Sequence, residues 1–170
     1  GDLITPRHTF LNHALSVGLN WSIHDSLRLR TNISTAFRPP HVSELYSAGL
    51  HHGSAAIEMG DATLGTERAM KATADLEAFV LRGKLRLDLT LHASRIGGFI
   101  QLRPDGYLLT IRGAFPRFQY VASDVWMHGL DATSQWAFLP RWSLQSRFSL
   151  VRGRNMNADT WLFQMPADRF

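Results

Sequence analysis

Residues 11–24 read LNHALSVGLNWSIH, and apolar side chains alternate with small or polar ones along nearly the whole stretch. Every odd position except His13 is apolar, while every even position is small or polar. Successive side chains of a β-strand point to opposite faces, so this segment predicts a strand with one apolar and one polar face. An apolar sheet face of this kind requires either a packed core or lipid.

The same alternation recurs along the chain and predicts about six long strands. We expect them over residues 9–24, 27–34, 70–81, 85 to about 102, 118–137 and 142–150. In the clearest of the later strands, Leu85, Leu87, Leu89 and Leu91 alternate with Arg86, Asp88, Thr90 and His92. The fold class is therefore all-β, an antiparallel up-and-down meander.

The connections between these strands alternate between short and long. Tight turns are expected at Asp25-Ser26, Arg82-Gly83-Lys84 and Leu139-Pro140-Arg141, and long loops over about 37–69, 103–117 and 153–170. Transmembrane barrels place tight turns on one side of the membrane and long loops on the other. Strands of about 9–11 tilted residues cross a bilayer, which is longer than the strands of most soluble sheets. The pattern favours a membrane barrel.

Composition excludes some classes of protein. The chain has no cysteine, so disulfide frameworks and thiolate metal sites are excluded. Its net charge is +4, but only two of its 18 basic residues are lysines and no dense basic run occurs, so we do not expect nucleic-acid binding. The chain starts with Gly-Asp and has no signal peptide, which we interpret as an internal piece of a longer protein.

Several motifs add information that alternation cannot supply. In chain order they are FRPP (37–40), ELY (44–46), LHHG (50–53), EMGD (58–61), LGTE (64–67), RGAFP (112–116), GLD (129–131), VRGRN (151–155) and MP (165–166). Taken in this order, they resemble TonB-dependent outer-membrane receptors, in particular a subgroup that resembles receptors for zinc or metal chelates. The resemblance implies a slice of a 22-stranded transmembrane β-barrel without its plug, so that residues 1–170 form a partial barrel domain.

The resemblance also implies a function and partners. It indicates an outer-membrane receptor of a Gram-negative bacterium that imports a metal ion or metal complex of the siderophore, zinc or haem class. The implied partners are outer-membrane lipid, the parent protein's own plug domain, TonB and the solute. The isolated piece is expected to self-associate through its free edges and apolar face. We expect no cofactor, and we find no catalytic motif, so an enzyme is not expected.

The adjacent histidines His51 and His52 are the sharpest chemical signal in the chain. Imidazole suits zinc, copper, nickel and iron, and nearby carboxylates can complete a site. Glu58 and Asp61 lie in the same predicted loop, so the candidate substrate-binding residues are His51, His52, Glu58 and Asp61, with the two histidines as candidate metal ligands. Neighbouring residues of an extended chain point in different directions, so these histidines are also interpretable as ordinary polar loop residues.

Two further alternatives stay open. The segment from Phe37 to Tyr46 is predicted to hold a short helix after Pro39-Pro40, which either closes over substrate or packs the loop on the barrel rim. The whole pattern also fits a soluble lipocalin-like barrel or sandwich that binds an apolar ligand. In that case the leucines would face a closed interior rather than lipid.

Overall fold

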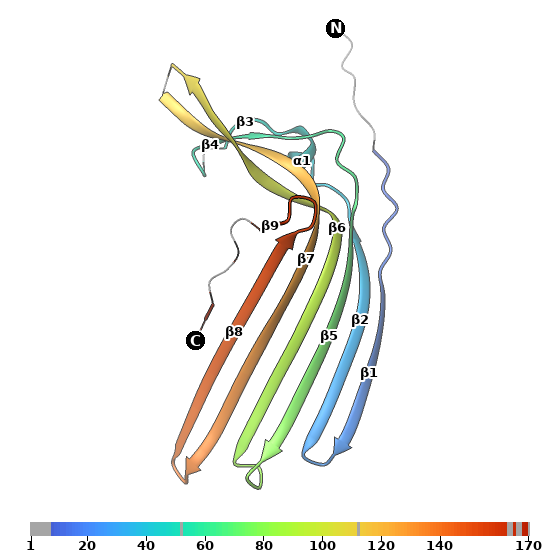
Figure 1. Ribbon diagram of the computed structural model, residues 1–170, viewed down its shortest axis with the longest axis vertical. Coiled ribbons are helices and arrows are strands. Elements are labelled where there is room, and N and C mark those ends of the chain that lie inside the picture. Colours follow the sequence, from blue (N-terminus) through green and yellow to red (C-terminus); the bar gives the residue numbers. More distant parts are fainter. Residues whose placement is uncertain (1–7, 52, 112, 163–164, 166–167, 170) are drawn as a thin grey trace.

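The structure is a computed structural model that describes residues 8–51, 53–111, 113–162, 165, 168 and 169. Its main feature is a single antiparallel sheet of long strands (Figure 1). The six long strands are β1 (Leu15–His24), β2 (Leu27–Arg38), β5 (Glu67–Val80), β6 (Leu85–Thr110), β7 (Gly113–Leu139) and β8 (Trp142–Asn155). The shorter elements are α1 (Val42–Tyr46), β3 (Ala48–His51), β4 (Ala56–Met59) and β9 (Thr160–Trp161).

Each long strand pairs with the next long strand along the chain, which confirms the predicted meander. The three tight turns lie together at one end of the sheet, and α1, β3, β4 and β9 lie at the opposite end (Figure 1). We call these the turn end and the loop end. No helix in the described residues is long and apolar enough to span a membrane.

The bounds of several elements differ from the sequence predictions. β1 begins at Leu15, where its pairing with β2 starts. Before that residue, His13 contacts Phe37 of β2 through a tilted ring contact, with centroids 4.0 Å apart, and without ladder pairing. The predicted loop over 103–117 is instead mostly a continuation of β6 and β7, which pair as far as Thr110 and Gly113. A register shift between Pro104 and Tyr107 accommodates the proline and glycine that suggested a turn.

The other two predicted loops also contain ordered elements. The stretch 37–69 holds the end of β2, the predicted short helix as α1, then β3, β4 and the start of β5. The stretch 153–170 holds the last residues of β8 and the short strand β9 among its described residues.

The strand register assigns most of the apolar residues of the six long strands to one face, which we call the leucine face. Leu91, for example, lies opposite Ala74 on one side and Leu130 on the other. This face is open: Leu19 is 60% exposed, Leu91 50% and Leu144 56%. Within the described residues, the buried apolar side chains are few, namely Leu45, Ala56, Ile57, Leu64, Ile100, Val125 and Leu162, and most belong to the loop end. The leucines therefore enclose no core of their own, in contrast to the lipocalin-like alternative.

Tryptophans mark both limits of the leucine face on β7. Trp126 and Trp136 are ten residues apart, lie on that face, and are 41% and 43% exposed. A tilted strand needs about 9–11 residues to cross a bilayer, and aromatic girdles line both interfaces of membrane barrels. The spacing of these two tryptophans thus matches the thickness of one bilayer.

The opposite face of the sheet carries charged side chains and we call it the polar face. Glu77 lies 3.0 Å from a guanidinium nitrogen of Arg86, 3.3 Å from Arg30 and 3.7 Å from Arg28. The hydroxyl of Thr90 donates to Asp75 over 2.6 Å. These contacts form a ladder of charges on the polar face, which also carries Asp88 and Asp131.

Candidate functional site

The segment between β2 and β5 folds back on the sheet at the loop end. Pro39 and Pro40 follow the last residue of β2, and His41 caps the N-terminus of α1. The His41 ring nitrogen Nδ1 accepts from the backbone N–H of Ser43 (3.3 Å), and the Glu44 carboxylate accepts from the His41 backbone N–H (2.7 Å). These two bonds form a capping box, so the local sequence itself fixes where α1 begins.

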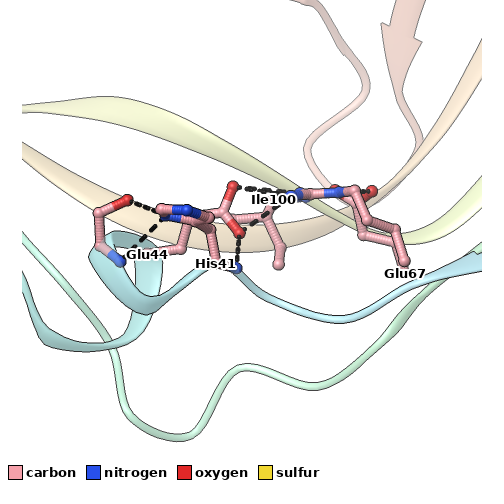
Figure 2. A network of polar contacts seen from close by, with 6 residues as sticks. His41, Glu44, Glu67 and Ile100 are labelled. Atoms are coloured by element: carbon pink, nitrogen blue, oxygen red, sulfur yellow. Dashed lines mark hydrogen bonds and ion pairs between the residues drawn. The ribbon is translucent and has the colours of Figure 1, made fainter. Parts of the chain in front are cut away.

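Arg38 links this helix to the sheet. Its guanidinium donates two hydrogen bonds to Glu67, over 2.6 and 2.7 Å, and further bonds of 3.1 Å to Glu44 (Figure 2). The hydrogen bonding of the Arg38 guanidinium to the Glu67 carboxylate is the main cause that raises the pKa of Arg38 above its usual value. The guanidinium therefore stays charged and holds two carboxylates from opposite ends of the segment.

Glu67 also anchors β6. It is buried, at 8% exposure, and its Oε1 accepts from the backbone N–H of Ile100 over 2.7 Å (Figure 2). Ile100 lies beyond Gly97, the residue of β6 that pairs with Arg68 near the start of β5, so the backbone of β6 has no β5 ladder partner at Ile100. We call Arg38, Glu44, Glu67 and the Ile100 N–H the rim latch, since together they tie α1, β5 and β6.

A small apolar cluster lies beside the rim latch. Leu45, Leu64 and Ile100 are buried together, and Tyr120 of β7 packs against them. The Tyr120 hydroxyl donates to Glu58 over 3.1 Å. Burial, followed by the hydrogen bond to Glu58, raises the pKa of Tyr120, so the hydroxyl keeps its proton and remains a donor.

The β3–β4 hairpin extends the sheet at the loop end. β4 pairs in parallel with β7 from Ile57 and Arg117 to Met59 and Gln119. β8 leaves β7 at Val125, so β4 covers an edge of β7 that β8 does not reach. The long segment is thereby an ordered part of the rim.

The structure brings together two of the predicted site residues. Nδ1 of His51 lies 3.5 Å from Oε1 of Glu58 and 3.1 Å from the hydroxyl of Ser54. The His51 side chain is 62% exposed and that of Glu58 only 14%. The pair thus presents an accessible imidazole beside a carboxylate that Tyr120 already orients.

The other two predicted residues do not join this pair. Asp61 accepts hydrogen bonds from the backbone N–H (2.8 Å) and the hydroxyl (2.6 Å) of Thr63, and the hydroxyl bond is the main cause that lowers the pKa of Asp61. Its carboxylate therefore closes a turn. His52 lies outside the described residues, and among those that are described no cluster of three or more His, Cys, Asp or Glu could hold a metal ion.

The rim latch was not predicted from the sequence, although Arg38 and Glu67 both lie in quoted motifs. Arg38 and Glu67 are direct register partners of β2 and β5. These two residues, one basic and one acidic, flank a long insertion between neighbouring strands. That arrangement is a sequence signal that could have indicated the ion pair between them.

Comparisons with known proteins agree with this geometry. The family model described as TonB dependent receptor-like, beta-barrel matches residues 5–169. The fold is similar to the copper transporter OprC, with a TM-score of 0.72 and 19% identity over 90% of this chain and 22% of that one. It is also similar to the siderophore receptor PirA from Pseudomonas aeruginosa, with a TM-score of 0.65 and 15% identity over 84% of this chain and 28% of that one.

A third solved structure, the alcaligin outer-membrane receptor FauA from Bordetella pertussis, has a TM-score of 0.55 and 15% identity over 91% of this chain and 24% of that one. The chain thus spans between 22% and 28% of the length of these three structures. A search among curated proteins finds no significant match. The sheet, its register and the match over residues 5–169 show that the chain belongs to the TonB-dependent receptor family, as part of its β-barrel.

Proposed function

We propose that this chain is part of the wall of an outer-membrane receptor that imports a metal ion or a metal complex. The observation that carries the proposal is the exposed leucine face. On β7, Trp126 and Trp136 lie at its two limits, and the distance along the strand between them matches the thickness of one bilayer. The polar face of the same strands would then line the interior of a 22-stranded barrel and contact the receptor's plug domain. Energy for import would come from TonB.

The proposed class of solute rests on chemistry at the loop end. The names of two similar structures specify a copper transporter and a siderophore receptor. An exposed imidazole beside a carboxylate, as in His51 and Glu58, offers nitrogen and oxygen ligands for a metal or a metal chelate. We include His52 because it adjoins this pair in the sequence, and we assign Asp61 the supporting role of closing the turn after β4.

The rim latch would hold this proposed site in a fixed position. Glu44 in α1 and Glu67 in β5 bind the same guanidinium, so the segment that carries His51 is tied to the barrel wall on both sides. A solute at His51 would therefore be presented at a fixed position above the strands. Import itself would require rearrangement of the plug. In water, the isolated chain would self-associate through its leucine face and the outer edge of β1.

Metal binding to the full receptor tests the assignment of the solute. We expect His51→Ala to weaken binding of Cu²⁺ or Zn²⁺, measured by isothermal titration calorimetry, and to reduce uptake of the metal by cells. His24→Ala is the matched control, because His24 also bonds a nearby serine (3.0 Å to the Ser26 hydroxyl) but lies at the turn end. Equal binding and uptake by the two variants would refute a role of His51 in contacting the metal.

A further inference from the structure

Two arginines lie where the leucine face ends toward the loop end. Along β6 the residues of this face are Leu85, Leu87, Leu89, Leu91, Ala93 and then Arg95. On β5, Arg68 lies on the same face, one step beyond Met70, the register partner of Arg95. Diagonal neighbours of this kind are about 7–8 Å apart, within reach of long side chains. Both arginines are exposed, so their guanidiniums can converge on one ligand.

These two cations have no protein counter-charge in the part of the chain that the structure describes. Neither Arg68 nor Arg95 has an ion pair or a side-chain hydrogen bond there, although Arg152 pairs with Asp168 (2.6 Å) and Arg154 with Asp159 (2.7 Å). Asp124, the acidic residue beyond Trp126 on β7, does not serve as their counter-charge. Its carboxylate accepts a hydrogen bond from the backbone N–H of Gly98 over 3.0 Å.

The absence of acidic residues extends over the whole leucine face. From the turn end to the row that contains Arg95, the leucine-face positions of the six described long strands hold no Asp or Glu. On β5 and β6 the positive charge of Arg68 and Arg95 therefore lies at the border of an apolar surface, whereas the arginines near this level on β8, Arg152 and Arg154, are each paired with an aspartate. Two arginines beside an apolar surface favour an anionic ligand whose charged group is attached to hydrocarbon.

The depth of Arg68 and Arg95 in the membrane indicates which anionic ligand they bind. Arg95 is the direct register partner of Trp126, the tryptophan at the loop-end limit of the leucine face. Tryptophan and tyrosine of membrane proteins lie at the depth of the lipid headgroups. A guanidinium binds phosphate through paired, charge-assisted hydrogen bonds, and long basic side chains at this depth extend toward the headgroups.

We propose that Arg68 and Arg95, beside Trp126, bind the phosphate of an anionic lipid headgroup in the leaflet on the loop side. This inference rests on the proposed membrane location of the leucine face. The bound lipid would fix the depth of β5 and β6 in the membrane, and these two strands also carry part of the rim latch.

Lipid binding to the full receptor tests the inference. The receptor would be purified in a zwitterionic detergent and titrated with phosphatidylglycerol or phosphatidylcholine, with bound lipid counted by native mass spectrometry. We expect preference for phosphatidylglycerol, and we expect the double variant Arg68→Gln, Arg95→Gln to lose about fivefold in affinity for each arginine removed. The lost affinity should also shrink with added salt.

Arg147→Gln is the matched control, because Arg147 is exposed and without an ion pair in the described residues but lies on the polar face. It should leave the preference for phosphatidylglycerol unchanged. An equal preference in the wild type and the double variant would overturn the inference while leaving the barrel assignment intact. A wild-type receptor that takes up neither lipid would instead refute the membrane location on which it rests.

Discussion

Replacement of Glu67 tests whether the rim latch holds the segment between β2 and β5. Glu67→Ala removes the acceptor of the Ile100 N–H, and leaving such a buried donor unpaired costs about 1–3 kcal/mol. It also removes one of the two carboxylates on Arg38, which we value at only about 1 kcal/mol because the Arg38 side chain is 46% exposed and keeps Glu44. The expected total is about 2–4 kcal/mol.

This loss should be visible as local opening rather than global unfolding. The backbone N–H groups of Gly60 and Asp61 donate to the carbonyls of Ser47 (2.7 Å) and Glu44 (2.9 Å), and both bonds break if the segment itself opens. A loss of about 3 kcal/mol raises the open population about a hundredfold. Hydrogen–deuterium exchange at Gly60 and Asp61 should accelerate by that factor in the receptor reconstituted in lipid.

Two further variants make the measurement decisive. Glu67→Gln keeps an oxygen for the Ile100 N–H and loses only the charge, so its exchange should lie between the wild type and Glu67→Ala. Glu77→Ala removes a carboxylate that likewise pairs with arginine, in this case three arginines of the wall, and should leave exchange at Gly60 unchanged. Unaltered protection of Gly60 in Glu67→Ala would refute the role of the rim latch.

Three other predictions concern the wall and the turn after β4. Leu87→Arg on the leucine face should cost about 2–4 kcal/mol in urea unfolding of the reconstituted receptor, whereas Asp88→Asn on the polar face should cost far less; equal costs would contradict the assigned faces. Gly129→Ala should destabilise the receptor by about 1–3 kcal/mol, because the added Cβ would lie 2.6 Å from a backbone oxygen of β8. Gly65→Ala, where an added Cβ meets open space, should be neutral. The depressed pKa of Asp61 stabilises its turn above the ordinary carboxyl pKa of 3.8, and this stability should disappear as the pH falls through the lowered value; exchange in Asp61→Asn should lack that pH dependence.

The sequence predicted the wall well because a period of two is a local signal. Alternation alone placed Leu87 and Asp88 on opposite faces, and the register of β5, β6 and β7 confirms that assignment. The short helix after Pro40 was also predictable, since its start depends on residues within one turn. Local chemistry thus determined both the strands and the start of α1.

Other features depend on pairing between distant residues, which alternation does not report. Pro104 and Gly106 suggested a loop, but a bulge absorbs them and β6 continues to Thr110. The site prediction grouped Asp61 with His51 because they are close in sequence, yet Asp61 bonds within its own turn. The rim latch joins residues 29 positions apart, so its discovery required the register of β2 and β5.

The central claim, that the leucine face contacts lipid, can be measured directly because the chain contains no cysteine. Single cysteines at successive positions from Leu85 to Arg95 would each carry a nitroxide label in the receptor reconstituted in a bilayer. We predict that collision with molecular oxygen, which concentrates in hydrocarbon, peaks at the odd positions and reaches its minimum at the even ones. Peaks at the even positions, or no alternation at all, would contradict the account.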